Sequence, residues 1–158
     1  MTDPQKTIAV KILPNVWIGN FRAAQSKVFF DKEKITAVIN STVNVPNYFN
    51  FDQNVEYLRI PVHDTEKLRD WYRFYQYFPI CTEFIYKNAV IENKNVFIHC
   101  NMALQRAPTI VAAYLIKFYE IPPEKAINHI LKYKPDCFHD RKSVNFSQSL
   151  KKWASKYL

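Results

Sequence analysis

The sequence predicts an α/β protein in which a mostly parallel central sheet is flanked by helices. Short runs rich in β-branched residues alternate along the chain with longer segments whose apolar residues recur at helical spacing. That alternation is typical of a sheet covered by helices on both faces. The composition is 48% hydrophobic and 16% aromatic with 1 glycine, which excludes a disordered chain. The length of 158 residues predicts a single domain over residues 1–158.

Apolar runs mark the expected strands. The run "KILPNVWIGN" (11–20) predicts a strand that closes in a turn at Gly19 and Asn20. The runs "ITAVINST" (35–42) and "VEYLRIPV" (55–62) are rich in β-branched residues and predict further strands. The run "NVFIHC" (95–100) predicts a buried strand.

The segments between and after these runs predict helices. The segment "FRAAQSKVFFDKEK" (21–34) is interpreted as helical. Between Thr65 and Glu92 the apolar and aromatic residues recur at helical spacing, and Pro79 is expected to start or break a helix there. The remaining helices are expected at residues 107–119, 122–133 and 144–157.

The charge balance favours an anionic partner. Lys and Arg exceed Asp and Glu by 22 to 14, which gives a formal net charge of +8. Phosphoproteins, nucleic acid and acidic lipid all fit that charge, which cannot choose among them. No apolar run approaches the roughly 20 residues that span a bilayer, and residues 1–10 are too polar for a signal peptide. We therefore expect a cytoplasmic protein without membrane contact; a viral source would place it in the host cytoplasm or the virion.

The 3 cysteines do not predict a disulfide framework or a metal site. Cys81, Cys100 and Cys137 are odd in number and lack metal-ligand spacing, which suits a reducing compartment. We expect Cys81 and Cys137 to be buried thiols without a chemical role. No second His or Cys lies at metal spacing from His63, so no metal and no cofactor are expected.

The stretch "VFIHCNMALQRAPTIVAAYL" (96–115) predicts an anion-binding loop. Cys100 ends a buried strand and Arg106 begins a helix, with five residues between them. Backbone N–H groups of such a tight loop point inward, the helix N-terminus adds partial positive charge, and an arginine fork grips phosphate oxygens. The residues expected to bind the anion are Asn101, Met102, Ala103, Leu104, Gln105 and Arg106.

The same loop predicts a nucleophilic thiol. Helix N-termini and neighbouring cations favour the thiolate, which is the reactive form of cysteine. We therefore expect Cys100 to attack phosphorus, with His99 orienting the loop by hydrogen bonding rather than acting as a base. Displacement at phosphorus also needs a proton for the leaving oxygen and later a base for water. Asp64, after the strand "YLRIPV", is the candidate, with Glu66 and Asp70 as nearby alternatives.

These residues resemble the cysteine-dependent dual-specificity phosphatases, particularly the small single-domain kind that includes the poxvirus H1-type enzyme. The resemblance covers nearly the whole chain: "ILPNVWIGNFRAA", "ITAVINST", "YLRIPVHDT", "VFIHC" with "RAPTIVAAYLIKF", "PPEKAINHILKYKP" and "NFSQSLKKWASKYL". It implies a protein tyrosine phosphatase-like fold. It also implies that Cys100 is the nucleophile, Arg106 the phosphate clamp, and Asp64 the acid and then the base.

The chain departs from the family pattern at two loop positions. The family has Gly where Ala103 stands, and a Cβ there costs on the order of 1 kcal/mol if the residue needs a positive φ. The family usually has Ser or Thr where Ala107 stands, and that hydroxyl stabilises the departing thiolate when water breaks the phosphocysteine. Arg-Ala-Pro also resembles the loop end of plant glucan phosphatases. We expect an active, slow enzyme; the alternative is a pseudophosphatase that binds phosphopeptide without turnover.

The loop interior predicts the substrate class. Residues 101–105 carry no Lys or Arg, which argues against the phosphoinositide branch of the family. The loop also lacks the pattern of the related RNA 5′-triphosphatases, although the net charge keeps RNA open as a less favoured partner. A glucan phosphatase is a further alternative. Phosphotyrosine and phosphoserine or phosphothreonine in proteins are the expected substrates, and no sequence pattern indicates an oligomeric state.

Overall fold

A five-stranded sheet forms the centre of the structure, a computed structural model that describes residues 6–65, 67–138 and 143–158. The strand order is β1-β2-β5-β3-β4. β1 pairs antiparallel with β2, and the other neighbouring pairs are parallel, as the sequence predicts. The strands are β1 (Ala9–Leu13), β2 (Val16–Gly19), β3 (Ile35–Asn40), β4 (Glu56–Arg59) and β5 (Asn95–His99).

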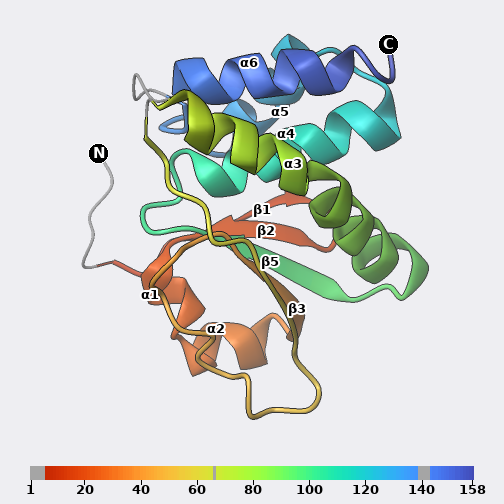
Figure 1. Ribbon diagram of the computed structural model, residues 1–158. Helices are drawn as coiled ribbons and strands as arrows, with labels where there is room; N and C mark the ends of the chain where they lie inside the picture. The colour runs from red at the N-terminus through yellow and green to blue at the C-terminus, as the bar shows by residue number, and fades with distance from the viewer. Residues whose placement is uncertain (1–5, 66, 139–142) are drawn as a thin grey trace.

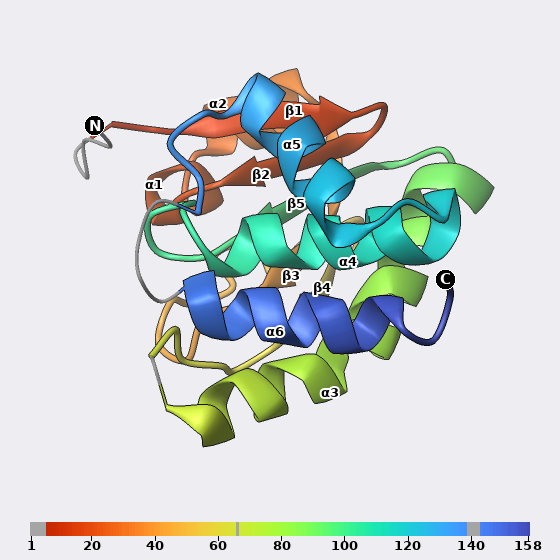
Figure 2. The ribbon, with the colours of Figure 1, turned by 90° about the horizontal axis from the view of Figure 1, so that it is seen from above.

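Helices cover both faces of this sheet (Figure 1). The short helices α1 (Phe21–Ala24) and α2 (Lys27–Lys32) lie on one face. The other face is covered by α3, α4, α5 and α6, and α6 lies between α3 and α4 when the molecule is seen from above (Figure 2). These helices are α3 (Leu68–Ile85), α4 (Arg106–Tyr119), α5 (Pro123–Tyr133) and α6 (Ser143–Ala154), and a π-helical segment η1 (Tyr86–Ile91) follows α3.

The helix α4 occupies the middle of the larger core. Its residues from Arg106 to Ile116 are all buried, which explains why the run "IVAAYLI" is apolar on every side. The fully buried Trp153 of α6 packs against it, and the indole Nε1 donates to the Ala113 carbonyl at 2.9 Å. Because α4 is enclosed in this way, its first residue is held in a fixed place.

The N-terminal segment differs from the expected single strand. The run 11–20 forms a hairpin of two antiparallel strands, because Pro14 and Asn15 turn the chain, with Asn15 at a φ of 65°. The expected helix at 21–34 is divided in two, because Ser26 caps a second helix: its Oγ accepts a hydrogen bond from the Phe29 N–H at 3.2 Å.

The expectation that Pro79 starts or breaks a helix is wrong. α3 continues through Pro79 for 18 residues. The cost of a proline inside a helix is offset here because Phe74, Phe78 and Ile85 form a continuous buried stripe on both sides of it. Pro79 itself lies on the exposed face of the helix.

We predict that Pro79→Ala raises the free energy of unfolding by about 1–3 kcal/mol, because alanine restores a helical hydrogen bond and removes the ring clash. Urea unfolding followed by tryptophan fluorescence measures it. Ile80→Ala, at the neighbouring exposed residue, is the control and should change stability little. A loss of stability in Pro79→Ala would mean that the rigidity of proline in the unfolded chain outweighs its helical cost.

Candidate active site

The carboxyl ends of the parallel strands meet at one edge of the sheet, and the loop 100–106 begins there. Gly19 ends β2 at this edge, where an added Cβ would lie 2.4 Å from the Ile8 carbonyl oxygen and 2.6 Å from the Phe97 ring. Only glycine fits so close an approach. The Gly19 carbonyl then accepts from the Cys100 N–H at 3.4 Å, and the Asn101 carbonyl accepts from the Phe21 N–H at 3.0 Å.

β3 holds the same loop from the other side. The His99 carbonyl accepts hydrogen bonds from the Ser41 N–H at 3.0 Å and from the Ser41 hydroxyl at 2.6 Å. Sequence reasoning did not identify Gly19 or Ser41 as supports of the site. The position of the only glycine at a strand end was the one signal available for the first of them.

A cavity of about 180 Å³ lies over the loop. Its lining comprises Asp64, Cys100, Asn101, Met102, Leu104, Gln105 and Arg106. The structure therefore brings the predicted nucleophile, clamp and acid to one cavity. Ala103, Ala107 and His99 are buried behind it and do not line it.

Arg106 joins the two halves of this cavity. The Arg106 residue is only 6% exposed, and its guanidinium Nη1 donates to the Val62 carbonyl at 2.9 Å. Its Nε lies 3.9 Å from Asp64 Oδ2. Asp64 does not follow β4 directly, because that strand ends at Arg59. Pro61, two residues later, has no backbone N–H to continue the pairing. The intervening residues bring the carboxylate back over the loop.

The alternative acids differ from Asp64. Asp70 is buried in α3 and accepts a hydrogen bond from the Thr65 hydroxyl. It does not line the cavity. Glu66 lies outside the described residues. The Asp64 side chain is 35% exposed and faces the cavity, so a substrate can reach it.

His99 is a neutral, buried imidazole. Its pKa is lowered to about 3, chiefly by burial and in smaller part by the nearby Arg59 and Arg106, against a hydrogen bond with the Cys100 backbone that raises it. The ring stacks on Phe97 at 5.6 Å between centroids. These contacts support the interpretation that His99 orients the loop, and an enclosed ring of this kind is poorly placed to act as a base.

The backbone at Ala103 is left-handed, with a φ of 62°. That is the conformation for which glycine is preferred, so the methyl group of Ala103 is strained. The segment after α5 braces this part of the loop: the Phe138 N–H donates to the Leu104 carbonyl at 3.0 Å, and Cys137 Sγ lies 3.6 Å from the Ala103 oxygen.

The other cysteines are buried, as the sequence predicts. Burial raises the pKa of Cys137 to about 12 and raises the pKa of Cys81 as well. Both thiols therefore stay protonated at neutral pH and are poor nucleophiles.

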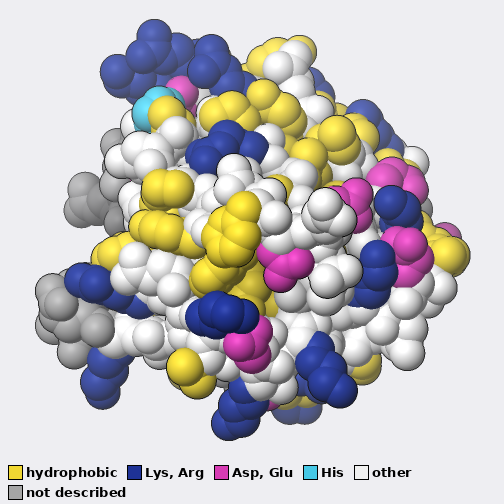
Figure 3. Space-filling view, turned by 90° about the horizontal axis from the view of Figure 1, so that it is seen from below, with side chains coloured by type: hydrophobic (Ala, Val, Ile, Leu, Met, Phe, Trp, Pro, Cys, Tyr) yellow, Lys and Arg dark blue, Asp and Glu magenta, His cyan; other side chains and the backbone are white. Residues whose placement is uncertain are grey.

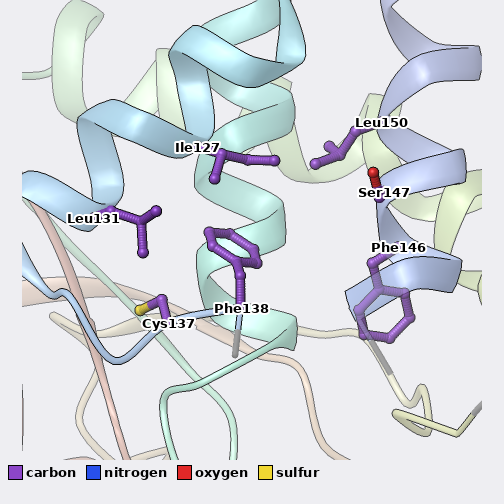
Figure 4. A pocket seen from close by; sticks show the side chains of 7 residues that line it. All are labelled: Ile127, Leu131, Cys137, Phe138, Phe146, Ser147 and Leu150. Atoms are coloured by element: carbon purple, nitrogen blue, oxygen red, sulfur yellow. The ribbon is translucent and has the colours of Figure 1, made fainter. Parts of the chain in front are cut away.

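A second cavity, of about 280 Å³, lies between α5 and α6 (Figure 4). Its lining is Ile127, Leu131, Cys137, Phe138, Phe146, Ser147 and Leu150. It is larger than the cavity over the loop but has no charged side chain, so it offers nothing that binds a phosphate or moves a proton. The chemistry points to the smaller cavity.

Within residues 6–65, 67–138 and 143–158, no group of three or more His, Cys, Asp or Glu side chains is placed to hold a metal ion. In the same part of the chain, no helix combines the length and apolar character needed to cross a bilayer.

Comparison with known proteins agrees with this geometry. Residues 16–156 match the family described as "Dual specificity phosphatase, catalytic domain". The chain belongs to this family. Dual specificity protein phosphatase 9 of Homo sapiens is 32% identical over 109 residues, which are 68% of this chain and 27% of that protein. Dual specificity protein phosphatase 1 of Homo sapiens is 33% identical over 125 residues, 77% of this chain and 31% of that protein.

A solved structure shares the fold. The crystal structure of a mouse putative dual specificity phosphatase, complexed with zinc tungstate, has a TM-score of 0.78 with 20% sequence identity. The superposition covers 99% of this chain and 92% of the mouse chain. The chain thus has the dual specificity phosphatase fold, although it spans less than a third of the length of the two human relatives.

We predict that Ala103→Gly raises the free energy of unfolding by about 1 kcal/mol, because glycine adopts the left-handed backbone without a strained Cβ. Chemical denaturation measures the change. The same substitution at Ala112, in the interior of α4, should lower the stability by about 1 kcal/mol or more. If both variants were destabilised alike, the loop would not be strained at Ala103.

Proposed function

We propose that this chain is a protein phosphatase that hydrolyses phosphotyrosine and phosphoserine or phosphothreonine through a phosphocysteine intermediate. The observation that carries the proposal is that Cys100, Arg106 and Asp64 line one cavity, with Arg106 fixed by Val62 and in contact with Asp64. We further propose that residues 1–158 act as a single catalytic domain.

In the first step, Cys100 Sγ attacks phosphorus as a thiolate and forms an S–P bond. The P–O bond to the substrate breaks, and Asp64 gives its proton to the leaving oxygen. The loop amides and the Arg106 guanidinium stabilise the charge on the remaining phosphoryl oxygens. The hydrogen bond from Nη1 to Val62 leaves other guanidinium N–H groups to bind the phosphate.

In the second step, water attacks the phosphocysteine, Asp64 takes a proton from that water, and the S–P bond breaks to release the thiolate. A hydroxyl on the residue after the arginine would stabilise this thiolate, but Ala107 has none. Ala107 is fully buried, which leaves its methyl group behind the loop rather than in the cavity. The second step should therefore be slower than the first.

The competing proposal is a phosphopeptide-binding module. The strained Ala103 and the missing hydroxyl at Ala107 favour it, because both are departures that slow turnover and leave an anion cradle in place. Turnover of a generic aryl phosphate separates the two proposals, since a binding module releases no aryl alcohol.

Asp64→Asn should lower kcat by roughly 10²- to 10⁴-fold for phosphate esters with poor leaving groups, and by less for an activated aryl phosphate, since only the former need the proton. Steady-state kinetics with the two substrates measure the difference. Cys100→Ser is the inactive reference. Asp70→Asn is the matched control, because Asp70 lies outside the cavity; a larger loss there than in Asp64→Asn would move the acid to Asp70.

The absence of a hydroxyl at Ala107 should be visible in pre-steady-state kinetics. If phosphocysteine hydrolysis is limiting, rapid mixing with an aryl phosphate should release one equivalent of aryl alcohol in a burst before a slower steady state. Ala107→Ser should raise kcat and shrink the burst. The activation free energy of the second step should fall by at most the value of one hydrogen bond to a charged group, about 1.5–3 kcal/mol. Ala103→Gly should not reproduce that effect. A linear time course in the wild type, unchanged in Ala107→Ser, would show that Ala107 is neutral.

A further inference from the structure

Exposed side chains at the start of α3 and at the end of α6 form a basic part of the surface, and the two helices meet there where Lys152 contacts Tyr72. We call it the basic strip, and its members are Leu68, Arg69, Tyr72, Lys152 and Lys156. Lys152 Nζ lies 5.4 Å from the centroid of the Tyr72 ring and 5.2 Å from that of Tyr75. Lys156 Nζ lies 5.2 Å from the Tyr75 centroid. Both ammonium groups are thus held over aromatic faces. A partner that binds them therefore loses less free energy to the ordering of the two lysine side chains.

The described parts of α3 and α6 offer little acidic charge to offset this strip. The chain from Ser143 to Leu158 contains neither residue type. In α3, Asp70 is buried against Thr65, and Glu83 forms an ion pair with Lys117 at 2.5 Å. Arg69, Lys152 and Lys156 make no ion pair within the described ranges.

Other parts of the surface are different. On the face seen from below, Asp and Glu side chains stand among many of the Lys and Arg side chains (Figure 3). An example elsewhere on the molecule is the ion pair between Lys27 and Asp31 of α2, at 2.9 Å. The charge of the basic strip therefore differs from that of surface regions where acidic and basic side chains alternate.

The basic strip begins close to the catalytic cavity. α3 starts at Leu68, only a few residues after Asp64, and Tyr72 follows one helical turn later, about 6 Å along the axis. The chain from Asp64 to Leu68 spans at most about 14 Å. A substrate with its phosphate in the cavity and its backbone extended along α3 would reach Lys152 about four to seven residues from the phosphorylated side chain.

The exposed apolar side chains of the basic strip favour a polypeptide as the partner. Leu68 is 68% exposed and directly precedes Arg69, and Tyr72 is 46% exposed and contacts Lys152. A polypeptide can cover them with an apolar residue of its own while its carboxylates meet the lysines. A phosphodiester backbone has no apolar group for Leu68, and a lipid surface would need a broad basic face rather than a strip along one helix contact.

We propose that the basic strip docks an acidic segment of the phosphoprotein substrate, one that includes an apolar residue, beside the phosphorylated site. The proposal rests on the proposed phosphatase function. It makes Lys152 and Lys156 determinants of substrate choice that act on binding and not on the chemical step.

The test uses two fluorescent phosphopeptides that are identical except at positions four to seven residues from the phosphotyrosine. At those positions one peptide carries Glu residues around a Leu, and the other carries Gln in place of each Glu. Binding is measured by anisotropy with the Cys100→Ser chain, which does not turn over. The acidic peptide should bind about tenfold more tightly than the neutral one at low salt. Lys152→Gln combined with Lys156→Gln should abolish that difference while retaining the aliphatic contacts over the rings.

Lys151→Gln is the matched control, because Lys151 is exposed on the same helix but makes none of the ring contacts with α3. Equal binding of the two peptides, or an equal loss in Lys151→Gln, would overturn the proposal. Loss of binding to RNA or to acidic vesicles in the double variant, without any peptide preference, would overturn it in favour of those partners.

The same variants separate this proposal from the proposed function. In the otherwise wild-type chain, the double variant should keep its kcat and KM for a small aryl phosphate, which does not reach the basic strip. Absence of aryl phosphate turnover with lysine-dependent peptide binding would refute the phosphatase and leave the docking site. Turnover without a peptide preference would refute only the docking site.

Discussion

The hydrogen bond from Arg106 Nη1 to the Val62 carbonyl connects the two halves of the site. It joins the first residue of the buried helix α4 to the segment after β4, two parts of the chain 44 residues apart. Asp64 lies two residues beyond Val62, so the same contact sets the carboxylate 3.9 Å from Arg106 Nε. Because α4 is enclosed by the core, the guanidinium has little freedom, and the acid is placed relative to a fixed cation.

The supports of the loop explain how it tolerates an unfavourable residue. Ala103 carries a left-handed backbone in a position where glycine would be unstrained. Hydrogen bonds from Phe21, Ser41 and Phe138 hold the loop or the strand before it at separate points. Strained backbone persists where its surroundings determine it in this way. The cradle shape is therefore retained, and the departure at Ala107 bears on the release of the thiolate rather than on the binding of phosphate.

Local patterns predicted what depends on local sequence. The buried strand 95–99, the start of α4 at Arg106 and the parallel sheet follow from apolar runs and their spacing, and they bring Cys100 and Arg106 together. The continuity of α3 through Pro79 could not be predicted, because the packing of Phe74, Phe78 and Ile85 in the folded core decides it. The Val62 contact and the basic strip were also missed, since each joins segments that are distant in the sequence.

The proposed phosphatase reaction requires Cys100 to form a covalent bond to phosphorus. Acid quench during turnover of a ³²P-labelled phosphotyrosine peptide, followed by mass spectrometry of the proteolysed chain, tests it directly. We expect label on the peptide that contains Cys100, approaching one equivalent because Ala107 slows hydrolysis, and no label in Cys100→Ser. Turnover with no label on Cys100, or label on another residue that persists in Cys100→Ser, would contradict it.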